Sequence, residues 1–264
     1  ATLASVTALI IMGQHTGSFY VAAFFRFVLV MIGVLSSSIV NLIFLPPKFE
    51  TKIYYNSMNI SSDIFVWFKL VLNDTSEFHN IKQDGDQLNS RINKLEKIFD
   101  YYNEERPLTK KHIYQQNRKK ILFREVVRTT RQAYEVLKRM SRYQNDLYQL
   151  NNQLLLQIKL ELDSLVTLHE QIFKSLSKKA RYDVTQLDYE VDNPQKKNLM
   201  DAFQQELIKN PHQTQYSYSN MMQIIAEIEE YRYQLEHLDR IRLSFFTYHR
   251  SDTDIDISDE DFDL

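Results

Sequence analysis

Five basic side chains recur along one face of a helix that the sequence predicts between residues 108 and 150, and a row of this kind could bind an anion. We call these residues the basic strip: Arg124, Arg128, Arg131, Lys138 and Arg142. Closely spaced positive groups attract anionic lipid headgroups, acidic partners or organic anions. The alternative is that they form the charged, solvated face of a helix in a bundle, with Glu135 as the one interruption.

Two polar residues in an apolar stretch, Arg26 and Asn41, form a second candidate site. An ionisable side chain at the bilayer centre costs at least ~2.5 to 3.5 kcal/mol unless it is solvated or paired, so it indicates a function by default. At about 1.5 Å per residue, Arg26 lies roughly 30 Å from Pro46, at the far interface. Arg26 could therefore contact an anion or simply reach water. For Asn41, the alternative is a hydrogen bond that only packs two helices together.

The sequence contains no motif for catalysis or metal binding. Its seven histidines are scattered, and it has no cysteine, no HExxH motif and no glycine-rich phosphate loop. His169 and His237 each adjoin a glutamate, but neighbours on a helix lie about 100° apart, so we expect both histidines on the solvated surface. The sequence predicts no enzyme, no catalytic residue, no cofactor and no metal. With a net charge of -2, it does not favour nucleic acid as a partner.

An apolar run must position Arg26 and Asn41. Residues 19 to 45 carry a single charge, and this run is longer than the roughly 20 residues that a helix needs to cross a bilayer. Residues 1 to 13 are also apolar and resemble half of a preceding span, so we expect residues 1 to 47 to be the C-terminal part of a multi-pass transmembrane domain. The run ends at Pro46 and Pro47, which cannot continue a helix. A buried helix of a soluble protein is the alternative.

The basic strip belongs to a second region, residues 48 to 250, which we predict to be a helical bundle. Only three prolines and one glycine follow Pro47, too few for a sheet with tight turns. Apolar residues three and four positions apart predict helices over these ranges: 48 to 72, 88 to 102, 122 to 147, 155 to 176 and 217 to 248, with a short helix near 196 to 209. Trp67 suits either a bilayer interface or the bundle core. The predicted fold is all-α: a transmembrane helical hairpin followed by an antiparallel bundle.

The flanks of the bundle carry opposite charges. Lys48 and Lys52 follow the apolar run, and basic residues beside a span favour the cytoplasmic side, so we expect the bundle to be cytoplasmic. Residues 251 to 264, SDTDIDISDEDFDL, carry seven acidic side chains and no base. Such charge repulsion predicts a disordered acidic tail. This tail could fold back onto the basic strip.

The end of the apolar run also has a distinctive order of features. An arginine opens the last span in FFRFVLVMIG, Asn41 is followed by LIFLPPKFE, and a helical domain comes next. This order resembles the aromatic acid exporter family, and more closely its small bacterial members with a C-terminal exporter-associated domain, which are related to fusaric acid resistance pumps. The resemblance is sharpest between Arg26 and Glu50.

The resemblance implies a multi-pass protein of the bacterial plasma membrane that forms homo-oligomers and exports aromatic carboxylates or other small organic acids. Under this hypothesis Arg26 would be the external or mid-pathway contact for the anion, Asn41 would belong to the same pathway, and the basic strip would be the cytoplasmic contact. The alternative hypothesis belongs to another class: a membrane-anchored scaffold or interaction protein that recruits a partner and has no transport activity.

Overall fold

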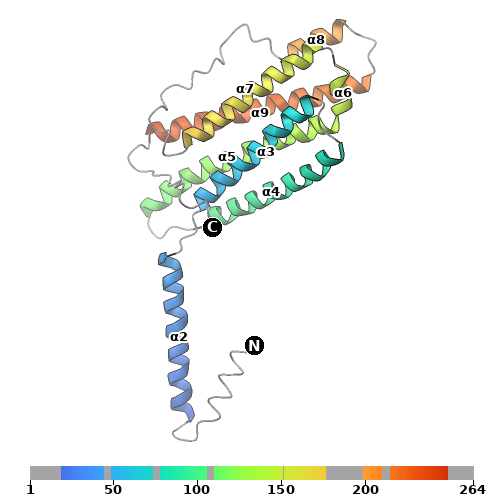
Figure 1. Cartoon of the computed structure of the whole chain (residues 1–264). Helices are drawn as coiled ribbons and strands as arrows, with labels where there is room; N and C mark the ends of the chain where they lie inside the picture. The colour runs from blue at the N-terminus through green and yellow to red at the C-terminus, as the bar shows by residue number, and fades with distance from the viewer. Residues whose placement is uncertain are drawn as a thin grey trace. The chain divides into compact units, whose positions relative to one another are not determined.

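The computed structural model describes residues 19–44, 49–73, 78–105, 110–150, 152–176, 199–209 and 215–248. Within these ranges the chain forms helices and no strand, which confirms the all-α class. The helices are α2 (Phe19–Phe44), α3 (Phe49–Leu72), α4 (Phe78–Glu104), α5 (Lys110–Arg142), α6 (Gln144–Tyr148), α7 (Asn152–Leu176), α8 (Leu199–Lys209) and α9 (Gln215–Tyr248) (Figure 1). The chain divides into two compact units, Ala1–Lys48 and Phe49–Leu264.

The first unit contains α2, whose apolar side chains are exposed on every side. Tyr20, Phe24 and Phe25 are exposed, and so are all four residues from Leu29 to Ile32, which together go once around the helix. Among the residues that the structure describes, no helix is both long enough and apolar enough to cross a membrane. The predicted transmembrane hairpin therefore stays a prediction, and its first half, residues 1 to 18, lies outside the described residues.

The second unit is an antiparallel helical bundle, as the sequence predicts. α3, α4 and α5 pack on one another, α9 lies along α5, and α7 packs against α9 and α3. In Figure 1, α3 and α5 run in one direction while α4, α7 and α9 run in the other. The short helices α6 and α8 both contact α9, while α6 also contacts α5 and α8 also contacts α7. α5 is therefore a central helix of the bundle, with α4 on one flank and α9 on another.

The apolar stripes of the predicted helices pack together in one core. On α5, the buried positions follow the predicted spacing: Leu122, Val126, Thr129, Ala133, Val136 and Met140. Trp67 is partly buried and packs against this core, in agreement with the second of its two interpretations. Polar contacts also join three helices: Glu50 of α3 accepts hydrogen bonds from Tyr102 of α4 at 2.9 Å and from Lys119 of α5 at 3.1 Å. Sequence periodicity thus predicts the core, because each helix buries one regular stripe.

The predicted end of the helix that carries the basic strip is wrong. The apolar spacing predicts a helix that continues to Leu147, but α5 ends at Arg142 and the short helix α6 follows before α7 begins at Asn152. The break comes at Tyr143, where φ is -111° and ψ is 28°. Leu147 remains fully buried, so the reorientation keeps the apolar stripe in the core. Without a proline or glycine near residue 143, the sequence carries no local signal for this break.

Candidate functional site

The basic strip lies on α5 as predicted, but its members have different surroundings. The side chains of Arg124 and Arg128 are each 59% exposed, whereas that of Arg131 is 24% exposed. Lys138 and Arg142 are also exposed. The strip is therefore not one uniform surface, because its central arginine is partly covered by a neighbouring helix.

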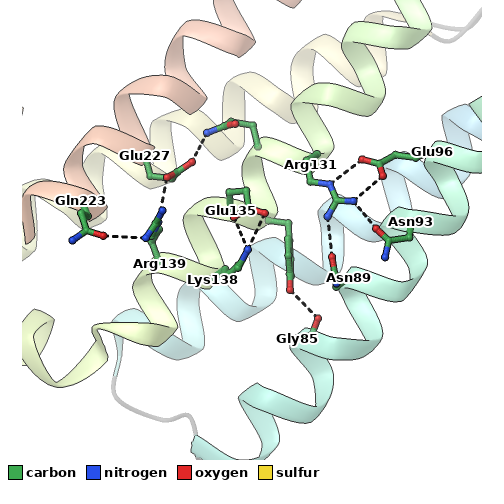
Figure 2. A network of polar contacts seen from close by, with 12 residues as sticks. Gly85, Asn89, Asn93, Glu96, Arg131, Glu135, Lys138, Arg139, Gln223 and Glu227 are labelled. Carbon is green, nitrogen blue, oxygen red and sulfur yellow. Dashed lines mark hydrogen bonds and ion pairs between the residues drawn. The ribbon is translucent and has the colours of Figure 1, made fainter. Parts of the chain in front are cut away.

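That neighbour is α4, which binds Arg131 through three side chains (Figure 2). The Arg131 guanidinium donates to both carboxylate oxygens of Glu96, at 2.9 and 2.8 Å. It also donates to the side-chain oxygens of Asn89 at 2.8 Å and Asn93 at 2.6 Å. The hydrogen bond with Glu96 raises the pKa of Arg131. A guanidinium with four such bonds ties α5 to α4 and has little capacity left for a ligand.

A second polar network ties α5 to α9 (Figure 2). Glu227 accepts a hydrogen bond from Gln132 at 2.7 Å and lies 3.5 Å from Nε of Arg139. Gln223, one turn earlier on α9, accepts from Arg139 at 3.0 Å and from Tyr143 at 3.1 Å. Sequence reasoning missed both networks, because the period of a single helix does not reveal its partner. The spacing of Gln223 and Glu227 by four residues was the available signal.

Three of the four exposed bases of the strip lie beside carboxylates of their own helix. Arg124 contacts Glu125 at 3.1 Å, and Arg128 lies 3.9 Å from the same carboxylate, which is buried. Lys138 contacts Glu135 at 2.9 Å. Two acidic residues thus neutralise part of the positive charge that the sequence predicts for this face. Anion docking at the strip stays a prediction, with Arg131 assigned to helix packing.

A buried histidine corrects another expectation. His169 is only 1% exposed, so its predicted place on the solvated surface is wrong. Its Nδ1 lies 2.7 Å from the hydroxyl of Tyr231 on α9, and its ring stacks on Phe173 with centroids 4.5 Å apart. Burial lowers the pKa of His169 to about 3 and raises that of Tyr231. The signal was its position between Leu165 and Ile172, which belong to the apolar stripe of α7.

A buried ion pair lies on α9. Arg242 is 0% exposed, and its Nε donates to Asp239 at 2.6 Å. Nη2 of Arg242 also lies 2.6 Å from the same Asp239 oxygen, but neither Nη atom has a hydrogen-bond partner among the described residues. Leaving charged donors partly unsatisfied in a core is costly, so this pair makes the bundle sensitive to any change that leaves one charge alone.

The second predicted site, on α2, involves one described side chain. Arg26 is half-buried, whereas the side chain of Asn41 lies outside the described ones. The two residues belong to the first unit and the basic strip to the second. The roles of Arg26 and Asn41 in a pathway stay predictions.

Comparison with known proteins gives the chain a family. It is 34% identical over 257 residues to the UPF0421 protein YgaE of Bacillus subtilis (strain 168), and the match covers 97% of this chain and 71% of that protein. The chain belongs to the UPF0421 family. No protein-family model matches it, so the likeness to the aromatic acid exporter family stays a resemblance. No solved structure matches it either.

The described side chains of this UPF0421 member form ion pairs and hydrogen bonds between helices. Within the described ranges, no group of three or more histidine, cysteine or acidic residues could hold a metal ion. His169, whose pKa is lowered by burial, is enclosed by Phe65, Phe173 and Tyr231. This arrangement favours a structural role for His169 and Tyr231, and anion binding by the exposed bases stays a prediction.

Proposed function

We propose that this chain is part of a bacterial plasma-membrane protein that exports small organic anions, aromatic carboxylates among them, and that its second unit is a cytoplasmic bundle. The observation that carries the membrane assignment is the exposure of apolar side chains on every side of the described part of α2. A helix that is apolar all round is stable when a large core or a bilayer surrounds it. In water, each exposed apolar Å² costs roughly 25 cal/mol.

The proposed span is the whole apolar run, residues 19 to 45. Side chains of α2 are described without a break from residue 23 to residue 38, which is shorter than the roughly 20 residues of a span. The proposal therefore depends on the flanking residues of the run as well. Pro46 and Pro47 would mark its cytoplasmic end, followed by Lys48 and the first turn of α3.

The export step rests on the resemblance to the aromatic acid exporter family and on Arg26, the one charge of α2. A guanidinium in an apolar segment can compensate a carboxylate that leaves water. Asn41 would lie further along the same helix and would assist through hydrogen bonding. The protein would act as a homo-oligomer, as the resemblance implies. On the cytoplasmic side, Arg124, Arg128, Lys138 and Arg142 remain available to attract anions or anionic headgroups.

Flux through proteoliposomes tests the proposal. Full-length protein would be reconstituted in liposomes loaded with radiolabelled benzoate, and efflux would be measured at increasing internal concentration. We expect saturable efflux that falls about ten-fold in Arg26→Gln and is largely kept in Arg26→Lys, because lysine preserves the charge. Both variants should reconstitute in equal amounts and with equal helix content.

Two results would contradict the proposal in different ways. Saturable efflux that Arg26→Gln leaves unchanged would remove Arg26 from the mechanism. No saturable efflux, together with stoichiometric co-purification of one cytosolic protein, would favour the membrane-anchored scaffold.

A further inference from the structure

A groove between the first half of α5 and the last part of α9 is not used by the proposed function. These two segments lie side by side at one end of the bundle (Figure 1). The groove has a volume of about 480 Å³. Its basic lining residues are Arg118, His237 and Arg240, and its apolar ones are Ile121, Ile241 and Phe245. It therefore combines apolar surface with positive charge.

The charge of this groove differs from that of the basic strip. None of the residues that line it is acidic, and the remaining lining residue is Ser244. Along the strip, Glu125 and Glu135 lie beside the exposed bases. An anion would therefore meet less competition from carboxylates in the groove than along the strip. Arg240 is exposed and donates only to a backbone carbonyl of its own helix, at 3.3 Å, among the described residues.

The chain itself contains a segment of complementary chemistry. Residues 251 to 264 alternate acidic and apolar side chains, first in Asp254, Ile255, Asp256, Ile257 and again from Asp261 to Leu264. In an extended conformation, alternate side chains point to opposite faces. Each of these two stretches therefore presents one apolar face and one acidic face of its own, and the faces are reversed between them. A groove with an apolar surface and basic residues can accept one such stretch, for example Asp254 to Ile257.

The segment also begins close to the groove. α9 ends at Tyr248, and His237 lies eleven positions earlier, or roughly 17 Å along the helix. An extended chain covers about 3.3 Å per residue, so a return path of this length needs about five residues after the turn. Ile255 and Ile257 are therefore within reach of the whole groove. Tethering gives the segment an effective concentration in the millimolar range, so even a weak contact would be occupied.

We propose that the groove is the docking site of the acidic segment 251–264 of the same chain. Its apolar side chains lie against Ile121, Ile241 and Phe245, and its carboxylates lie near Arg240 and His237. The docked segment covers the groove and excludes other anions from it. This assignment replaces the expectation that the segment folds back onto the basic strip.

Spin labelling of the intact chain tests the proposal, because the chain has no cysteine of its own. A nitroxide on Ser258→Cys reports how mobile the segment is. At 50 mM NaCl we expect an immobilised component in the spectrum. Its fraction should fall at least three-fold in Arg240→Glu and at 500 mM NaCl, since screening weakens contacts between exposed charges. The matched control is Arg142→Glu, an exposed base of the strip, which should leave the spectrum unchanged.

A charge exchange keeps the test decisive if Arg240→Glu perturbs the fold. Combining Arg240→Glu with Asp254→Arg and Asp256→Arg should restore at least half of the immobilised component. A label that is mobile under all conditions would overturn the proposal. So would immobilisation that Arg142→Glu removes and Arg240→Glu does not, because it would put the segment on the strip. Immobilisation that grows with protein concentration would overturn it as well, since the segment would then belong to a second copy.

Discussion

α2 and α5 are both long helices, but they distribute their side chains in opposite ways. From Leu122 to Arg142 of α5 the apolar residues are buried and the exposed residues are charged, whereas the described part of α2 exposes apolar residues on all sides. In the bundle, polar groups such as Arg131 and Arg139 also join helices to one another. The difference teaches that α5 buries one stripe and exposes charge, as an amphipathic helix of a bundle does, while α2 has no such division between faces.

In the bundle, the largest loss of stability is expected when the buried ion pair between Arg242 and Asp239 is broken. Arg242→Met leaves the carboxylate of Asp239 buried without its counter-charge, and breaking a buried pair in this way costs about 3 to 5 kcal/mol. Urea unfolding followed by circular dichroism would measure the loss. Arg242→Met combined with Asp239→Leu should recover most of it, because no charge is left alone. A single variant as stable as the wild type would show that polar pairing in the core does not support the bundle.

A smaller loss in the free energy of unfolding is expected when the pH is lowered. His169 is neutral in the folded bundle with a pKa of about 3, whereas an unfolded histidine titrates near 6.5. Between these values the unfolded state binds the additional proton, so the free energy of unfolding falls as pH falls below 6.5. At pH 4.5, His169 should account for about 2 to 3 kcal/mol of lost stability relative to pH 7.5.

The matched variant for this prediction is His169→Gln, which keeps a polar group near Tyr231 but does not titrate. Its stability should fall less than that of the wild type over the same pH range, measured by urea unfolding at pH 7.5 and 4.5. Equal losses in the two proteins would contradict the buried, neutral histidine.

How far the sequence predicts this molecule depends on whether a feature belongs to one helix or to several. The stripe from Leu122 to Met140 could be predicted, because burial repeats with the period of a single helix. The contacts of Arg131 could not, since Glu96 lies on another helix and only packing brings the two together. His169 is an intermediate case: its position in the stripe of α7 indicated burial, but its polar character suggested a surface residue.

The hydrogen bonds that join Arg131 of α5 to α4 should contribute less to stability than the buried ion pair. Arg131→Met removes hydrogen bonds to Glu96, Asn89 and Asn93, but Glu96 is partly solvated. Hydrogen bonds to charged groups contribute about 1.5 to 3 kcal/mol when buried, and solvent screening reduces this to about 1 to 2 kcal/mol here. Urea unfolding would measure the change. Arg131→Lys should recover only part of it, because lysine cannot form the bidentate contact. Full recovery of stability in Arg131→Lys would contradict the bidentate contact between Arg131 and Glu96.

The smallest effect is expected on the exposed face of the basic strip. Arg124→Ala should change the free energy of unfolding by no more than about 0.5 kcal/mol, because Arg124 is largely exposed and Arg128 remains near the Glu125 carboxylate. The same variant should weaken binding of the intact chain to anionic vesicles at low salt, if the strip attracts headgroups. Cosedimentation with vesicles containing phosphatidylserine would measure this. Binding that neither the substitution nor salt affects would leave the strip as a solvated face.

The most direct test of the central claim asks what surrounds α2. Nitroxides would be placed one at a time on cysteines at residues 29 to 32 of the full-length protein in lipid bilayers, with Arg128→Cys on α5 as the control. Collision with dissolved oxygen reports lipid, and collision with a water-soluble nickel chelate reports water. If α2 lies in the bilayer, all four positions will favour oxygen over nickel, while position 128 will favour nickel. Access of the nickel chelate to any one side of α2 comparable to that at position 128 would contradict a lipid-embedded helix.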